Sequence, residues 1–297
     1  MPSLAAVVVT HDSAAVLPDC LAALAREHVP AIVVDNASAD ASAALAEAAG
    51  ARVLKNARNE GYGRANDRGI HAAGSALVLV VNPDVTLRPG CADALCAAAE
   101  RYPDAALLAP RIVEPDGRLF FQPRSLLAPI RGARAPEGDC CAPFLSGACL
   151  LVRREAYLAL GGFDPNLFLF YEDDDLCRRA ADAGRALVHV HGAEALHRRG
   201  GSGAPSAARV FATRWHQAWS RAYVARKYGL RDPAAGDAGL NGLKAGLACL
   251  TLNRARIARY AGSAAGALAA RAGRTALARE GLAPCVPLSH PGERGPA

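Results

Sequence analysis

The 297-residue sequence lacks the marks of several large protein classes. Its nine cysteines include no C-x-x-C pair, and the adjacent Cys140 and Cys141 could not easily bind one metal ion together. We therefore expect neither a disulfide framework nor a zinc site. No run reaches the roughly 18–20 apolar residues of a membrane span, and no basic run carries the interleaved aromatics of a nucleic-acid surface. The chain enters a strand-like run at once, so we expect no cleavable leader and a reducing, cytoplasmic location.

The composition is that of a folded domain with a basic surface. Hydrophobic residues make up 52% of the chain, enough for a sizeable core, and a charged fraction of 21% argues against wholesale disorder. The formal net charge of +6 suits anionic partners such as nucleotide diphosphates or phospholipid headgroups. A basic surface without a particular partner explains this charge equally well.

Short apolar runs alternate with Ala-rich helical stretches, which is typical of an α/β protein with a parallel sheet covered on both faces. A turn at 114–117 predicts a hairpin between 112–113 and 119–121. Helical patterns return after residue 205. The predicted strands are 4–9, 32–34, 52–54, 76–81, 144–152 and 187–190, and the predicted helices are 14–26, 40–49, 63–73, 153–160, 173–183 and 205–228.

Polar residues follow three of these strands directly. Thr10 ends the first, Asp35 ends the second, and Asn82-Pro83-Asp84 follows the most apolar one. Ligands of parallel sheets bind beyond the carboxyl ends of the strands, so these side chains should meet at one edge. Asp84 would suit Mg²⁺ or Mn²⁺, which bind few protein carboxylates and use substrate phosphates for the rest. A structural type I turn is an equally good explanation of Asn-Pro-Asp.

A glycine-bearing turn, Asn59-Glu60-Gly61-Tyr62-Gly63, opens a predicted helix and is followed by Asn66. Close backbone approach at a helix N-terminus favours a phosphate. The pattern alone is weak, because a tight helix entry would look the same.

Four consecutive acids, Glu172 to Asp175, open another predicted helix behind Phe168-Leu169-Phe170-Tyr171. Like charges repel, and the crowding should raise the pKa of at least one carboxyl group, as a general base requires. A solvated helix start is the alternative. His197 follows the last predicted strand and could join Asp84 on one metal ion, although a single histidine is weak evidence.

Taken together, these motifs resemble glycosyltransferase family 2, and within it the bacterial rhamnosyltransferase-type branch that builds polysaccharides and glycolipids. The resemblance spans roughly residues 4–230. The resemblance rests on the joint order and spacing of the motifs. These are Val8–Ser13, Val33–Ser38, Asn59–Gly63, Asn82-Pro83-Asp84, Ser146-Gly147-Ala148, Gly161–Asp164, Glu172–Leu176 and His197.

The resemblance implies a GT-A fold, that is, an αβα sandwich with a mostly parallel central sheet. It implies an inverting transfer of a sugar from a nucleotide diphosphate donor, with Mg²⁺ or Mn²⁺, to a glycan or lipid-linked hydroxyl; dTDP-rhamnose is the first expectation for the donor and a UDP-sugar the second. The implied roles are general base for Asp173, metal contacts for Asp84 and His197, nucleotide-sugar contacts for Thr10, Asp35, Asn59, Gly61, Asn66 and Asn82, and sugar or acceptor contacts for Ser146, Gly147 and Glu172.

Some alternatives stay open at this point. Asp174 stands where the family usually has an apolar residue, so either Asp173 or Asp174 could be the base; the two point about 100° apart on a helix, so both cannot serve. A sugar-nucleotide pyrophosphorylase would want a Gly- and Arg/Lys-rich loop after the first strand, which Thr10–Ser13 is not. A degenerate, non-catalytic nucleotide- or glycan-binding protein is the third reading.

We predict a catalytic domain over 1–205, with a nucleotide-binding half at about 1–105 and an acceptor half at about 106–205. A helical extension should follow at 206–280, and a disordered tail at 281–297. The first helix of the extension alternates basic and aromatic residues, which suits peripheral docking at the inner face of an anionic membrane. The favoured interpretation is that the helix packs on the catalytic domain with its aromatic side chains inward. The residues concerned are Arg209, Phe211, Arg214, Trp215, Trp219, Arg221, Tyr223, Arg226 and Lys227.

Overall fold

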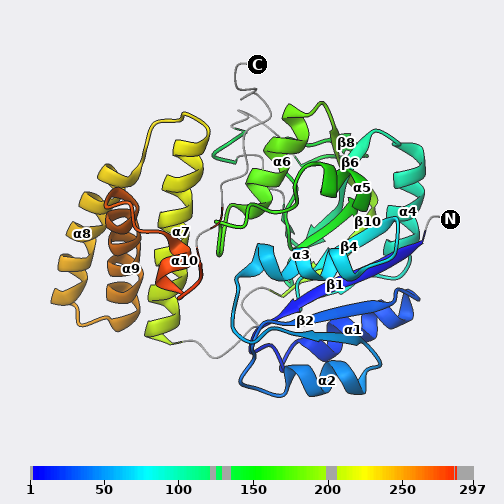
Figure 1. The fold of residues 1–297 in the computed structure, drawn as a ribbon, viewed down its shortest axis with the longest axis horizontal. Helices are drawn as coiled ribbons and strands as arrows, with labels where there is room; N and C mark the ends of the chain where they lie inside the picture. Colours follow the sequence, from blue (N-terminus) through cyan, green and yellow to red (C-terminus); the bar gives the residue numbers. More distant parts are fainter. Residues whose placement is uncertain (1–2, 121–124, 129–134, 199–205, 284, 286–297) are drawn as a thin grey trace.

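A computed structural model describes residues 3–120, 125–128, 135–198, 206–283 and 285. Its central feature is one ten-stranded sheet (Figure 1). In spatial order its strands are β3 (Arg52–Lys55), β2 (Ala31–Asp35), β1 (Leu4–Thr10), β4 (Leu77–Val81), β9 (Cys149–Arg153), β6 (Ala105–Val113), β10 (Ala186–His197) and β5 (Val85–Leu87), with β7 (Leu119–Phe120) on β6 and β8 (Cys140–Cys141) on β10.

The strands that carry the predicted site run in the same direction. β3, β2, β1 and β4 are parallel to one another, as are β6 and β10, whereas β9 and β5 run against their neighbours. Thr10 pairs with Asp35, and Val8 pairs with Val81 just before Asn82. The carboxyl ends of β1, β2 and β4 therefore meet at one edge, as expected, and the predicted hairpin forms between β6 and β7.

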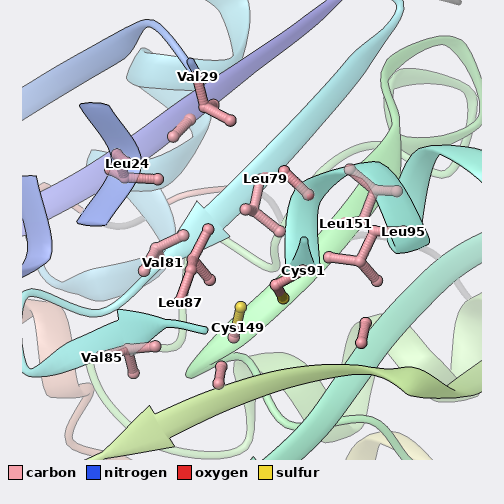
Figure 2. Close-up of a cluster of buried hydrophobic side chains, with 14 of the residues drawn as sticks. Leu24, Val29, Leu79, Val81, Val85, Leu87, Cys91, Leu95, Cys149 and Leu151 are labelled. Carbon is pink, nitrogen blue, oxygen red and sulfur yellow. The ribbon is translucent and has the colours of Figure 1, made fainter. Parts of the chain in front are cut away.

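Side chains alternate between the two faces of the sheet, and each face carries its own core. Ala6 and Val8 of β1 point into one core, and Val7 and Val9 point into the other. Figure 2 shows the first core around Leu79 and Leu151. Its covering helices are α1 (Leu17–Arg26), α2 (Ser42–Ala48) and α4 (Cys91–Arg101), and those of the second face are α3 (Tyr62–Ala72), α5 (Arg154–Ala159) and α6 (Glu172–Asp182).

This arrangement confirms the predicted αβα sandwich, with some differences in its elements. The last strand was predicted at 187–190 but continues to His197, because a bulge between Val190 and Glu194 lets it keep pairing with β6. The strand predicted at 144–152 is confined to Cys149–Arg153. Helix α4 is not among the predicted elements.

Four helices stand beside the sandwich (Figure 1). α7 (Ala207–Lys227), α8 (Ala234–Leu250), α9 (Arg254–Arg271) and α10 (Ala276–Arg279) share a third core. α7 and α9 approach closely at two glycines: a Cβ on Gly262 would lie 2.4 Å from the Phe211 carbonyl oxygen, and one on Gly266 would lie 2.2 Å from that of Trp215. Larger residues there would push the two helices apart.

The structure places the aromatic side chains of α7 inward. Trp215 and Trp219 are buried, and the Trp219 indole donates a hydrogen bond of 2.6 Å to the carbonyl oxygen of Arg274. Arg221 is paired with Asp237 at 2.6 Å. The favoured interpretation, inward packing of the aromatic side chains, therefore describes α7, and these side chains do not form an exposed docking face.

No helix within the described residues is long and apolar enough to cross a bilayer. The boundaries predicted at 105/106 and 205/206 stay predictions, and the second adjoins residues 199–205, which lie outside the described part. Most of the tail predicted at 281–297 also lies outside it.

A buried ion network joins α7 to the sandwich. The Lys227 ammonium lies 2.7 Å from the Asp164 carboxylate and 2.6 Å from the Asp175 carboxylate, and Arg179 lies 2.8 Å from the other oxygen of Asp175. At most 8% of any of these side chains is exposed. Each charge is thus compensated by a partner inside the protein, where water cannot solvate it.

Lys227→Met is expected to lower the free energy of unfolding by about 3–5 kcal/mol, because it leaves the buried Asp164 carboxylate without a cation and removes one of the two cations that pair with Asp175. Denaturant unfolding measures the change. The matched control on the same helix is Arg221→Met, which removes a more exposed ion pair and should cost about 1 kcal/mol or less. Equal losses in the two variants would show that the Lys227 network does not anchor α7.

Candidate functional site

A cavity of about 590 Å³ opens at the carboxyl edge of the sheet. The loops after β1, β2 and β4 form one wall, and α7 and α9 form the other. The cavity is lined by four of the site residues that were predicted from the sequence, namely Asn59, Gly61, Asn82 and Asp84. The remaining lining residues are Val9, His11, Ser13, Asn36, Tyr62, Pro83, Phe168, Leu169, Ser206, Arg209, Val210, Thr213, Arg214 and Arg259.

The structure brings Asp84 and His197 together. Asp84 ends the turn between β4 and β5, and His197 is the last residue of β10, where it pairs with Val85 of the antiparallel β5. The His197 Nε2 atom lies 3.2 Å from an Asp84 carboxylate oxygen, with 14% and 8% of the two side chains exposed. His197 therefore belongs to the strand itself, and the bulge in β10 carries it to the site.

This pair fits a divalent cation that completes its coordination with substrate oxygens. Mn²⁺ accepts both carboxylate and imidazole ligands, and Mg²⁺ accepts carboxylate ligands. The buried side-chain oxygen of Asn82, on the same turn, has no hydrogen-bond partner in the described part of the chain. That part holds no group of three or more His, Cys, Asp or Glu side chains that could bind a metal ion. A cation here would need phosphate or water oxygens as its other ligands.

Asn36 organises the glycine-bearing turn. Its amide nitrogen donates to the side-chain oxygen of Asn59 at 2.8 Å, and its oxygen accepts from the amide nitrogen of Asn56 at 2.8 Å and from the backbone N–H of Glu60 at 3.0 Å. Gly61 has a φ of +87°, and a Cβ there would lie 2.5 Å from the Phe168 carbonyl oxygen. The turn thus has a fixed shape that places Asn59 and Gly61 on the cavity wall.

Three of the predicted nucleotide contacts do not line the cavity. Thr10 and Asp35 are buried, and one side-chain oxygen of each has no hydrogen-bond partner among the described residues. Asn66 is fully buried and donates to the Tyr62 carbonyl oxygen at 3.0 Å, one turn back along α3. Their contacts with a nucleotide stay predictions.

The four consecutive acidic residues at the start of α6, Glu172 to Asp175, lie in different environments. Asp175 belongs to the Lys227 network, and Glu172 and Asp174 are buried. Asp173 alone of the four is half-buried. Its carboxylate accepts from the backbone N–H of Gly147 at 2.9 Å and from its neighbour's N–H at 3.0 Å, which fixes its orientation.

Burial perturbs the titration of this cluster. It raises the pKa of Asp173, while the N–H groups of Gly147 and Asp174 oppose the rise. Burial and the charge of Asp173 raise the pKa of Asp174 to about 7 and that of Glu172 well above its ordinary range. A carboxylate with a raised pKa is a better proton acceptor than an ordinary aspartate.

Asp174→Asn is expected to stabilise the protein near pH 8. The pKa of the Asp174 carboxyl group is 3.8 in the unfolded chain and about 7 in the folded protein. Ionisation of this group therefore lowers the free energy of unfolding as the pH rises between these two values. Asparagine cannot ionise, and the variant should gain at least about 1 kcal/mol, since one pKa unit corresponds to about 1.4 kcal/mol. Unfolding measured at several pH values should show this gain shrinking toward pH 4, and a pH-independent gain would contradict the assignment.

Asp173 adjoins the cavity through Gly147. The Tyr62 hydroxyl, on the cavity wall, donates to the Gly147 carbonyl oxygen at 2.6 Å, and the N–H of the same glycine holds Asp173. A Cβ on Gly147 would lie only 3.3 Å from that of Asp173, so a glycine suits this approach. Ser146 lines a separate hollow of about 30 Å³, and neither Asp173 nor Glu172 is among the lining residues of the large cavity.

The C-terminal helices contribute basic residues that sequence reasoning did not place here. Arg209 and Arg214 of α7 line the cavity together with Arg259 of α9. A membrane-facing position was only one of the two interpretations of these arginines. The spacing of the two arginines along α7 did not predict their place on the cavity, because that place depends on where the helix packs against the sandwich. His11, whose Nδ1 lies 3.0 Å from the Asn36 carbonyl oxygen, is a further lining residue that had no assigned role.

Comparison with known proteins identifies the family of this chain. Residues 5–161 match the model of the family described as glycosyl transferase family 2. The N-acetylglucosaminyl-diphospho-decaprenol L-rhamnosyltransferase of Mycobacterium tuberculosis is 34% identical over 233 residues, which cover 66% of this chain and 76% of that protein.

Solved structures agree on the fold. The mannosyltransferase PcManGT of Pyrobaculum calidifontis, in complex with GDP-Man and Mn²⁺, matches with a TM-score of 0.55 and 16% identity over 91% of this chain and 87% of its own. GalNAc-T7 with UDP, GalNAc and Mn²⁺ matches with a TM-score of 0.59 and 16% identity over 76% of this chain and 48% of its own. The sheet, the position of the cavity and these likenesses agree: this chain has a GT-A fold and belongs to glycosyltransferase family 2, whose members transfer sugars.

Proposed function

We propose that this glycosyltransferase moves a sugar, rhamnose in the first instance, from a nucleoside diphosphate to a hydroxyl of a lipid-linked glycan, with inversion at the anomeric carbon. The observation that carries the proposal is the pairing of His197 with Asp84, which lines the cavity at the carboxyl edge of the sheet. The Asp173 carboxylate, held by two backbone amides, adds a candidate base. The name of the mycobacterial relative supports rhamnose as the sugar. We take dTDP-rhamnose as the first choice of donor and a UDP-sugar as the second.

Asp84 and His197 would hold Mg²⁺ or Mn²⁺, with Asn82 beside them. When bound, such an ion supplies positive charge to the diphosphate leaving group. Thr10 and Asp35 would hold the nucleoside, and the Asn59–Gly61 turn and Asn66 would lie on the nucleotide side. Three arginines on the opposite wall would add positive charge toward a phosphate-bearing substrate.

Asp173 would act as the general base. Its carboxylate takes the proton of the acceptor hydroxyl as that oxygen bonds to the anomeric carbon, and the nucleoside diphosphate leaves from the opposite face of the sugar. The amides of Gly147 and Asp174 keep the carboxylate in place for this step. Ser146, Gly147 and Glu172 would surround the sugar or the acceptor.

The acceptor sets the expected location. A prenyl-diphosphate glycan, of the kind named for the mycobacterial relative, is presented at a bilayer surface. We therefore propose that the protein works at the cytoplasmic face of the membrane in peripheral contact with it.

The test is a transfer assay with dTDP-rhamnose or a UDP-sugar, N-acetylglucosaminyl-diphospho-prenol, and Mn²⁺ or EDTA. The proposal expects metal-dependent product whose glycosidic configuration, read by NMR, is opposite to that of the donor. Nucleotide binding without turnover would favour a degenerate binding protein. Formation of a nucleotide-sugar from a nucleoside triphosphate and a sugar phosphate would favour a pyrophosphorylase.

A further inference from the structure

One side of α8 carries a row of exposed leucines. Leu240, Leu243, Leu247 and Leu250 recur at intervals of three and four residues, which places them on one face of a helix, and Leu252 follows directly after it. Their exposed fractions lie between 53% and 83%. α8 packs on α9, and its buried Ala238 and Ala248 lie on the side of the helix opposite to the leucines, so the exposed leucines are not needed for that contact.

The surface around these leucines is open. A Cβ added at Gly239, just before the first leucine, or at Gly242 or Gly246, between the leucines in sequence, would meet no atom of the described residues within 4 Å. In Figure 1, α8 is the helix of the group farthest from the sheet. We call Leu240, Leu243, Leu247, Leu250 and Leu252 the leucine face.

The charge of this region has one sign. Residues 238–279 contain no Asp or Glu. Asp237, just before this stretch, is paired with Arg221 on α7. The exposed cations nearest to the leucine face in sequence are Lys244, Arg254 and Arg256, and the others in the stretch are Arg259, Arg271, Arg274 and Arg279.

We propose that the leucine face docks on the surface of an anionic phospholipid bilayer. Leucines that enter the acyl boundary are removed from water, while lysine and arginine side chains beside them reach the headgroup phosphates. A second apolar protein surface would satisfy the leucines but would leave Lys244, Arg254 and Arg256 without anions. The uniform positive charge therefore favours lipid as the occupant.

Docking would bring the active-site cavity close to the bilayer. α9 packs along α8 and carries Arg259, a lining residue of the cavity. A prenyl-linked acceptor could then reach the cavity while its chain stays in the membrane. This consequence rests on the proposed function, whereas the docking itself rests only on the leucine face and its charges.

The test is flotation of the full chain with vesicles of phosphatidylcholine, with and without phosphatidylglycerol. Wild-type protein should float with the anionic vesicles and lose this binding in high salt. Leu243→Glu/Leu247→Glu should weaken the partitioning by about tenfold or more, since it puts charge on the inserted face. The matched control is Leu268→Glu, another exposed leucine that lies instead beside Phe211 and Trp215.

Arg254→Gln/Arg256→Gln, which keeps every leucine, should weaken binding to anionic vesicles alone. Unchanged flotation of both double variants would overturn the proposal. So would light scattering that shows a dimer which the leucine substitutions dissociate, because a second copy would then cover the face. Transfer to a water-soluble acceptor separates the two claims: a leucine variant that transfers normally but does not float leaves the catalytic assignment intact.

Discussion

Asp173→Asn should lower the transfer rate by about 10²–10⁴-fold, the usual contribution of a general base. The substitution keeps the size of the side chain and removes its capacity to take a proton. Nucleotide binding should persist, because Asp173 is not among the residues that line the large cavity and is proposed to contact the acceptor. Steady-state transfer and nucleotide titration, measured on the same preparation, test both statements.

Asp174→Asn is the matched control, because the sequence left these two neighbours open as the base. The Asp174 side chain is buried, and one of its carboxylate oxygens has no hydrogen-bond partner among the described residues. The Asp173 side chain is half-buried and held by two amides. Asp174→Asn should therefore keep most of the activity. Near wild-type turnover by Asp173→Asn, or a larger loss in Asp174→Asn, would move the base to another residue.

Asp84→Asn should reduce transfer by about 10²–10³-fold or more, since it removes the proposed anionic ligand of a divalent ion that would offset the charge of the leaving group. The variant keeps the Asn-Pro turn between β4 and β5, so the fold should survive. Its affinity for a nucleoside diphosphate should no longer depend on Mn²⁺. Calorimetric titration of the nucleotide with and without Mn²⁺ measures this dependence.

Asp19→Asn is a suitable control for the loss of a carboxylate near this edge. Asp19 is half-exposed and pairs with Arg198, the residue after His197, at 2.8 Å. Its removal should leave transfer and metal dependence unchanged. If Asp84→Asn retained a Mn²⁺-dependent affinity, the metal would have to bind elsewhere.

The sandwich was predictable because its signals are local. The apolar runs of β1, β2 and β4 are buried on both faces, and such continuous runs are typical of parallel strands. Parallel strands also bring their carboxyl ends together, which is why Asp84 and Asn82 could be expected on the cavity before any geometry was known. α4 was missed even though it carries buried Leu95 and Cys96 toward the first core.

The remainder of the site depends on contacts between distant segments. His197 reaches Asp84 only because β10 bulges and then pairs with β5, and a pattern that alternates apolar and polar residues does not report a bulge. The central position of Asn36 follows from its hydrogen bonds to the Asn59 turn, 23 residues away. Arg209 and Arg259 reach the cavity through the docking of helices against the sandwich. An amphipathic pattern identifies an apolar face, but it does not say what covers that face.

The account as a whole is tested most directly by a thermal-shift measurement of the protein with UDP, dTDP, GDP and ADP, each with and without Mn²⁺. A ligand at about 100 times its dissociation constant stabilises the folded state by about 2.7 kcal/mol, which is readily seen. The account predicts a shift with a pyrimidine nucleoside diphosphate that requires Mn²⁺ and disappears in Asp84→Asn. No shift with any of the four nucleotides, or a shift that is the same without metal, would contradict it.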